Sequence, residues 1–390
     1  MISVDSRLET ADDLLDHLLG GTLEELDIPP EHAARARSLY AEVGAFLNRY
    51  GDTRTATAWD VYAQGSLRLN TVVRPIASSG EFDIDLVCVR DISKESTTQD
   101  RLKAEVGAAL ARYARLGDRQ ASCHENGRCW TLNYEGLRLH MDVLPSIPDP
   151  ASRPSGILLA DRAYPRWLSS DPIRYAAWFH DRMAIEFIRK RAELAEKRQS
   201  TLEQVPEYEV KTTLQRAVQA LKRHRDLFFI GAPESRPASI LITTLAAHAY
   251  RGEKSLFKTV GSMADTMEEF IIRDGRGWSV VNPVQPNENF ADQWQSDPSR
   301  RNVFQGWLVA LREQLAQVRG QRGLPLVVEQ LTRGFGPEVV KSAERLGSAY
   351  YRVRDAGRLT MAASGVLSTQ ATSSVRVKNH EFYGDEIPGK

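Results

Sequence analysis

Two aspartates separated by a single residue constrain this chain more than any other feature. They lie in the segment Glu-Phe-Asp-Ile-Asp-Leu-Val, which begins at Glu81. On a β-strand, residues i and i+2 share one face, so Asp83 and Asp85 project together while their apolar neighbours point to the other face. Adjacent carboxylates repel unless a cation lies between them, and Mg²⁺ prefers such oxygen ligands and leaves room for substrate phosphates. The segment therefore predicts a metal site on a strand.

The turn before these aspartates predicts a phosphate-binding site. The strand-like segment 59–64 ends at Gln64 and is followed by Gly65 and Ser66. This turn is expected to lead into a short helix. Free N–H groups at the start of a helix can bind a phosphate, and glycine lets the backbone approach an anion closely. A serine at this position can also be an ordinary helix cap. We favour nucleotide binding for all three residues.

A β-hairpin further along the chain supplies a third carboxylate. Residues 130–134 and 137–143 alternate between apolar and polar side chains on either side of Glu135-Gly136. His140 and Asp142 fall on the polar face of the returning strand. Since neighbouring strands lie about 4.8 Å apart, Asp142 can reach an ion held by the aspartate pair. We expect His140 to be an ordinary strand residue and not a general base.

The second half of the chain is expected to be helical, which makes the fold class α+β. The helical patterns cover residues 6–20, 30–50, 97–116, 172–198, 207–230, 238–250, 254–272, 297–319 and 336–355. Gly117 is expected to end the helix at 97–116, and residues 273–294 read mostly as loop. We predict a catalytic lobe with N-terminal helices at 1–165, a helical lobe at 166–363 and a C-terminal arm or tail at 364–390. The active-site cleft is expected between a mixed sheet and the helical lobe.

A basic run on the 207–230 helix is a further candidate for phosphate binding. Projected at about 100° per residue, Arg225 falls on the apolar stripe, Lys222 lies at its edge and Arg223 points away. Such a run is usually a solvated face. A cation at the rim of a buried stripe needs an anionic partner, so we expect Lys222 to bind a triphosphate.

The overall charge and the cysteines exclude several classes of protein. Lys+Arg 51 balances Asp+Glu 51, so we expect no strong nucleic-acid binding, which needs a basic surface. The spacing of Cys123, His124 and Cys129 does not indicate a zinc site. Three cysteines fit a reducing compartment, and no signal peptide or membrane-spanning run is apparent. We expect a cytoplasmic protein with no membrane association.

Together these features resemble the DNA polymerase β-like nucleotidyltransferases. More narrowly, the chain is similar to the bacterial cGAS/DncV-like nucleotidyltransferases (CD-NTases), which make cyclic oligonucleotide signals in antiphage defence. The narrower resemblance depends on Leu-Lys-Arg-His-Arg-Asp at 221–226, on Arg-Pro-Ala-Ser-Ile at 236–240 leading into Thr243-Thr244, and on the segment 282–294 with Asn-Pro and Asn-Phe-Ala-Asp-Gln-Trp. It spans residues 35–360.

The resemblance implies a mechanism and a set of ligands. Asp83, Asp85 and Asp142 would bind two Mg²⁺ ions, for which Mn²⁺ can substitute. Gly65 and Ser66 would hold the donor triphosphate, with Lys222 and Ser239 contacting its phosphates from the helical lobe. The substrates would be NTPs, ATP among them, and the product a cyclic di- or trinucleotide that acts on a downstream effector in CBASS signalling. Ile240 stands where related animal enzymes have a base-stacking tyrosine, and their zinc-binding insertion is missing.

Two other functions remain open at this point. One is transfer of a nucleotide to RNA or protein, as in tail-adding or adenylylating enzymes, although formal neutrality disfavours a long RNA. The other is a degenerate nucleotide-binding module, which would be expected to lack at least one carboxylate. The resemblance also implies a conjugation or regulatory partner at the C-terminal segment 380–390.

Overall fold

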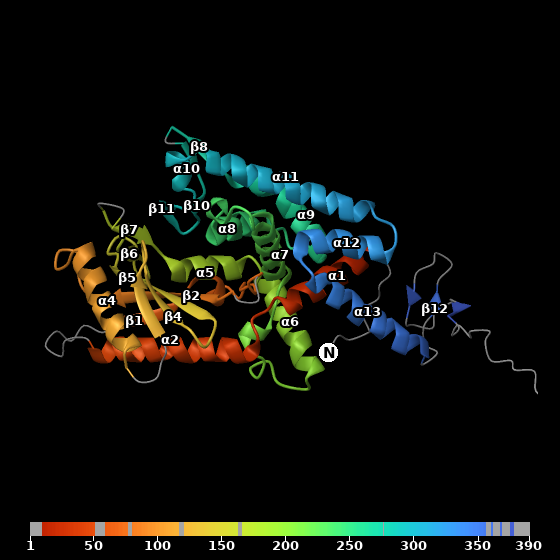
Figure 1. Cartoon of the computed structure of the whole chain (residues 1–390), viewed down its shortest axis with the longest axis horizontal. Coiled ribbons are helices and arrows are strands. Elements are labelled where there is room, and N and C mark those ends of the chain that lie inside the picture. The colour runs from red at the N-terminus through yellow and green to blue at the C-terminus, as the bar shows by residue number, and fades with distance from the viewer. Residues whose placement is uncertain are drawn as a thin grey trace, which may run out of the picture.

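The computed structural model describes residues 10–50, 59–76, 80–116, 121–162, 166–275 and 277–355, together with 360–361, 367–368 and 375–377. Figure 1 shows the sheet at one end of the molecule and the long helices α11 (Ser299–Gly320), α12 (Leu324–Phe335) and α13 (Glu338–Asp355) at the other. The predicted α+β class, with a mixed sheet and a helical second half, is confirmed. Gly117 and residues 380–390 lie outside the described residues.

The sheet places the two aspartate-bearing strands side by side. Its central strands are β2 (Phe82–Arg90) and β5 (Leu139–Pro148), which run parallel. The remaining strands pair antiparallel, in the overall order β1 (Trp59–Ala63), β2, β5, β4 (Trp130–Tyr134) and β3 (Ala121–Glu125). Two short strands, β6 (Ile157–Leu159) and β7 (Leu168–Ser170), extend from the end of β5.

Helices cover the face of the sheet opposite the aspartates. The side chains of Ile84, Leu86 and Met141 are almost fully buried there, in one core with residues of α2 (Pro30–Tyr50) and α4 (Gln99–Ala114). Because strand residues alternate between faces, burying these apolar side chains turns the intervening Asp83 and Asp85 to the other side. The hydrophobic pattern of β2 thus fixes which face carries the carboxylates.

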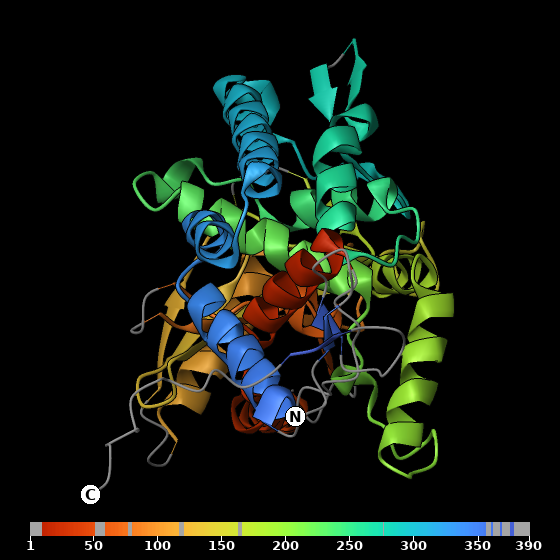
Figure 2. The same ribbon diagram turned by 90° about the vertical axis from the view of Figure 1, so that its right-hand side faces the viewer.

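The second half of the chain forms its own core, which includes the N-terminal helix. Its helices are α5 (Pro172–Asp181), α6 (Ala184–Lys197), α7 (Thr213–Phe228), α8 (Ser239–Ala249), α9 (Leu256–Thr266) and α11 to α13. Helix α1 (Ala11–Glu25) packs against α13, α9 and α7 (Figure 2), and Leu18 and Leu19 are fully buried in this core. The domain boundaries at residues 165 and 363 stay a prediction. None of the helices within the described ranges is long and apolar enough to cross a membrane.

The structure corrects several of the helix predictions. The segment 172–198 forms two helices, which are separated at Met183, where φ is −127° and ψ is 11°. Helix α7 begins only at Thr213, after a capping box. Helix α12 was missed; it lies between Gly323 and Gly336, whose positive φ angles mark its ends. Residues 273–294 contain short strands and a short helix.

Candidate active site

Three carboxylates converge on the open face of the sheet. In the parallel pairing of β2 and β5, Asp85 lies directly opposite Asp142. One carboxylate oxygen from each of these residues and from Asp83 lies within 4.8 Å of the others. Burial and the charges of the two neighbouring carboxylates raise the pKa of Asp85 to about 7. Such an all-oxygen donor set fits hard divalent cations.

The Gly-Ser turn packs directly against this cluster. Gly65 begins the short helix α3 (Gly65–Arg68) with a φ of 60°, and the Gln64 N–H donates a hydrogen bond of 2.9 Å to the Asp85 carbonyl. A Cβ atom added at Gly65 would lie 2.2 Å from Oδ2 of Asp85. Glycine is therefore required here by the carboxylate behind it as well as by the backbone conformation. Ser66 is the next residue of the same turn of helix.

Hydrogen bonds orient the carboxylates from outside the triad. His140 lies opposite Asp83 in the strand register, with Nε2 3.2 Å from Oδ1, and this contact is the largest cause that raises the pKa of His140 to about 9. Thr131 on β4 pairs with Asp142 and donates a hydrogen bond to it. Sequence reasoning missed Thr131, because a two-residue turn at Glu135-Gly136 would pair it with His140. The structure instead pairs Tyr134 with Leu139, and this register brings Thr131 opposite Asp142.

Helix α7 brings a buried lysine toward the triad. Lys222 is 5% exposed, and its ammonium donates hydrogen bonds of 3.1 Å to the carbonyl and the hydroxyl of Thr71. Burial, followed by the charge of Arg225, lowers the pKa of Lys222 to about 7, while the nearby Asp85 carboxylate opposes this shift. Lys222 is thus close enough to Asp85 for the two charges to interact. Ser239 lies at the start of α8, and its hydroxyl accepts a hydrogen bond from Arg225.

The expectation that Arg223 points away from the core was wrong. Arg223 is 1% exposed, donating to Glu338 at 2.7 Å and to the Phe335 carbonyl at 3.1 Å. His224 is also buried and accepts a hydrogen bond from the indole N–H of Trp307. The physical reason is that α12 and α13 cover the side of α7 that the helical projection left open. All four residues of the basic run are therefore interior.

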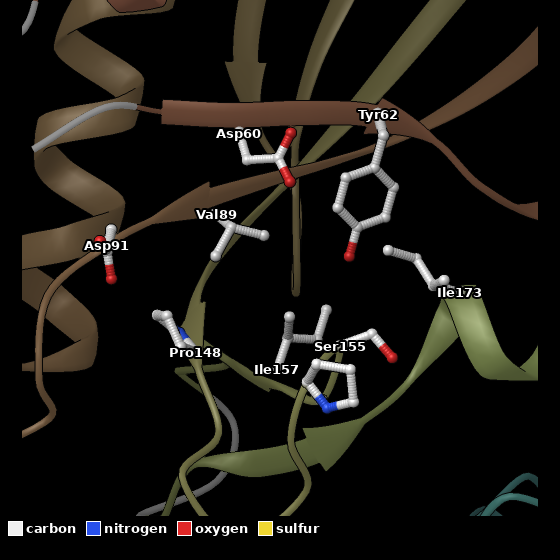
Figure 3. A pocket seen from close by; sticks show the side chains of 10 residues that line it. Asp60, Tyr62, Val89, Asp91, Pro148, Ser155, Ile157 and Ile173 are labelled. Atoms are coloured by element: carbon white, nitrogen blue, oxygen red, sulfur yellow. The ribbon is translucent and has the colours of Figure 1, made fainter.

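A cavity of about 410 Å³ opens on the same sheet face, beyond the triad. Its wall includes Val89, four residues after Asp85 on β2, and Figure 3 shows the Tyr62 side chain reaching into it from β1 toward Ser155 and Ile173. Burial raises the pKa of Tyr62, whose hydroxyl has no hydrogen-bond partner among the described residues. The lining contains no lysine or arginine, so this part of the face is unsuited to phosphate.

The triad is the candidate metal site within the part of the chain that the structure describes. Within the described ranges, the three aspartates are the only group of three or more His, Cys, Asp and Glu side chains with ligand atoms this close together. Cys123, His124 and Cys129 are not part of such a group there. Cys123 and Cys129 are free thiols, and burial raises the pKa of Cys123 to about 11.

The sequence of this chain is similar to those of known proteins over most of its length. Residues 18–182 match the family model described as Second Messenger Oligonucleotide or Dinucleotide Synthetase (SMODS) domain. A c-di-GMP synthase of Roseivirga ehrenbergii is 28% identical, over 95% of this chain and 97% of its own. The cyclic dinucleotide synthase CdnG of Bradyrhizobium diazoefficiens is 25% identical, over 96% and 95%.

Solved structures share the fold. The B. diazoefficiens CD-NTase CdnG in complex with GTP matches with a TM-score of 0.66 and 22% identity, covering 86% of this chain and 99% of its own. The Escherichia coli CdnC:HORMA complex matches with a TM-score of 0.62 and 14% identity, covering 82% and 96%. The Vibrio cholerae DncV cyclic AMP-GMP synthase in complex with nonhydrolysable GTP reaches 0.53 and 16%, covering 85% and 87%.

Proposed function

The chain belongs to the bacterial cGAS/DncV-like nucleotidyltransferases and makes a cyclic oligonucleotide second messenger, and on this premise we propose how it does so. It joins nucleoside triphosphates without a template into a cyclic di- or trinucleotide. The relatives named above as dinucleotide synthases favour the two-membered ring and favour GTP as a substrate, with ATP as a second candidate. The observation that carries the proposal is the convergence of three carboxylates from two neighbouring strands beside a glycine turn.

Each residue of the site has a proposed role. Asp83, Asp85 and Asp142 would hold two Mg²⁺ ions, or Mn²⁺ in their place. When bound, the ions supply positive charge at the donor α-phosphate and lower the pKa of the acceptor ribose hydroxyl. Asp142 accepts the proton of that hydroxyl as it attacks the α-phosphorus, and pyrophosphate leaves. The linear product then binds again in the opposite orientation, and a further round of the same reaction closes the ring.

The remaining groups bind the triphosphate. Gln64, Gly65 and Ser66 contact it from the sheet, where the turn lies against Asp85. Lys222 and Ser239 contact it from α7 and α8, and the Lys222 ammonium gains there the anionic partner that its burial requires. A phosphate nearby also raises the pKa of Lys222 and keeps the ammonium protonated at neutral pH.

The biological setting is part of the proposal. We place the protein in CBASS antiphage signalling in the cytoplasm, where its product activates a downstream effector. The E. coli CdnC complex with HORMA supports a protein regulator for this chain. A partner conjugated at the C-terminal segment 380–390 also remains part of the proposal. Intact-mass spectrometry of the protein from its native cells tests the latter, and an unmodified Lys390 terminus in every condition would remove it.

Incubation with labelled NTPs and Mg²⁺, without any polymer, tests the activity. We expect a phosphatase-resistant cyclic product, whose bases, ring size and linkage are identified by mass spectrometry and nuclease digestion. The double variant Asp83→Asn with Asp85→Asn keeps the side-chain volumes and should make none while unfolding at the wild-type temperature or above. In a parallel reaction that also contains RNA or protein, label found only on that RNA or protein would instead favour tail-adding or adenylylating activity. Undiminished ring formation by the double variant would contradict the assigned roles.

A further inference from the structure

We propose that Arg225 is a positioning residue that fixes the Ser239 hydroxyl as a hydrogen-bond donor to the substrate triphosphate. This inference rests on the proposed function and goes beyond it, because the basic run at 222–225 was expected to act through Lys222 alone. Arg225 lies one helical turn after Lys222 on α7 and is 5% exposed. In this proposal Arg225 acts through its contact with Ser239 and does not itself bind the substrate.

The direction of one hydrogen bond carries the argument. Nη1 of Arg225 lies 2.9 Å from Oγ of Ser239 and 3.1 Å from the carbonyl oxygen of Pro237. A guanidinium has only donors, so the serine oxygen must accept. The hydroxyl proton of Ser239 is then directed elsewhere, and it finds no acceptor among the described residues. Ser239 is exposed at the start of α8, so the proton is free for an acceptor from outside the chain.

The same contacts fix the backbone that leads into α8. One nitrogen of Arg225 donates to both the Pro237 carbonyl and the Ser239 hydroxyl, and this ties the segment 237–239 to the last turn of α7. Lys222, on the same face of α7, is itself fixed by its two bonds to Thr71. The planar guanidinium thus sets the position of Ser239 relative to Lys222, a geometry that a flexible lysine could not reproduce.

The local charges indicate that the missing acceptor is an anion. Asp226 is the carboxylate that Arg225 contacts, at 2.6 Å, and it also accepts a hydrogen bond from Arg236 at 3.3 Å. One carboxylate therefore serves two guanidinium groups. Among the described residues the ammonium of Lys222 forms no ion pair with a carboxylate, although the charges of Asp85 and Asp226 act on it. A partly buried region with excess positive charge favours an anionic ligand. A phosphate oxygen would accept the Ser239 proton and offset this charge.

A double-mutant cycle tests the coupling between the two residues. We would measure the dissociation constant of a nonhydrolysable NTP by calorimetry, and KM and kcat separately, for Arg225→Gln, Ser239→Ala and the combined variant. Each single change is expected to weaken NTP binding about tenfold, the equivalent of about 1.4 kcal/mol. The combined variant should be no weaker than either single one, because Arg225 acts through the serine hydroxyl.

Two further variants separate positioning from folding. Arg223→Gln removes a buried arginine from the same helix, which contacts Glu338 on α13, and should lower the unfolding temperature without changing NTP affinity. Arg225→Lys keeps the charge and one donor, so it should recover part of the affinity and also serves if Arg225→Gln fails to fold. Multiplying effects in the combined variant, or wild-type NTP affinity in Ser239→Ala, would overturn the role of Arg225. Absence of any product from wild-type protein would overturn the proposed function itself.

Discussion

The hydroxyl of Thr131 donates a hydrogen bond of 2.5 Å to Oδ1 of Asp142 across the antiparallel strands β4 and β5. Thr131 is 4% exposed, and its oxygen also accepts a hydrogen bond of 3.2 Å from the side-chain amide of Asn126. Asn126 is held in turn, because the Lys103 ammonium donates to its carbonyl at 3.2 Å. A chain of partly buried polar contacts therefore fixes the rotamer of the third carboxylate.

This relationship predicts that Thr131→Val weakens divalent metal binding. The substitution keeps the side-chain shape and removes the donor, so Asp142 is free to rotate and Mn²⁺ affinity should fall roughly 10–100-fold. Titration of Mn²⁺ by electron paramagnetic resonance measures this without turnover. Thr131→Ser keeps the hydroxyl and should bind the ion as the wild type does. Equal Mn²⁺ affinity in the valine variant would show that Asp142 is oriented by other contacts.

A methyl group at Gly65 should disable the site. Gly65→Ala places a Cβ against the Asp85 carboxylate and forces alanine to a positive φ angle, so Asp85 must shift. Misplacement of a reacting group by about 1 Å can cost roughly 100-fold in rate, and we expect a loss of that order in product formation. Gly20→Ala is the matched control, because it lies within α1 with no atom within 4 Å of the added Cβ. It should leave activity unchanged and stabilise the fold by about 0.5–1 kcal/mol.

Substitution of Lys222 and of Lys211 should distinguish an effect on substrate binding from an effect on stability. Lys222 donates to Thr71, and Lys211 donates to the carbonyl of the preceding Asn70 at 2.7 Å while also pairing with Asp27 at 3.5 Å. Lys222→Met should raise KM for the NTP roughly 10–100-fold, since a hydrogen bond to a charged group contributes about 1.5–3 kcal/mol. Lys211→Met should lower the unfolding temperature and leave KM unchanged. The reverse pattern would remove Lys222 from the binding site.

Glu186 should make the stability of the helical half depend on pH. Its carboxylate accepts hydrogen bonds from Tyr250 and from the backbone and side chain of Thr213, and pairs with Lys190 at 3.0 Å. Burial opposes ionisation of Glu186, but Lys190 and the Thr213 donors outweigh it and leave its pKa below the ordinary value. Its contribution is therefore complete above the ordinary pKa of about 4.3 and is lost as pH falls through the lower, folded-state value.

Glu186→Gln measures this contribution. At pH 7 the substitution should reduce the free energy of unfolding by about 1–3 kcal/mol, because the buried donors lose a charged acceptor. The difference in the free energy of unfolding between wild type and variant should shrink as pH drops below about 4 and the Glu186 carboxylate becomes protonated. Urea unfolding at pH 7, 4 and 3 provides the comparison. A constant difference over this range would exclude ionisation of Glu186 as the cause.

Periodicity alone explains why the metal-binding face could be predicted. Two carboxylates at i and i+2 must share a face of any strand, and the apolar residues between them decide which face is buried. The hairpin with its turn at Glu135-Gly136 places Asp142 on the polar face by the same alternation. The adjacency of β2 and β5 was expected from the three carboxylates, but alternation by itself does not require it, because α4 and two strands separate them along the chain.

Local sequence therefore determined the secondary structure near the site, the polar face of each strand and the acidic donor set. Tertiary structure alone decided that α12 and α13 cover α7 and bury Arg223, that Thr131 holds Asp142, and that Arg225 reaches Ser239. The physical reason is that side-chain periodicity reports the faces of one element, whereas burial and hydrogen-bond direction depend on which distant element packs against each face.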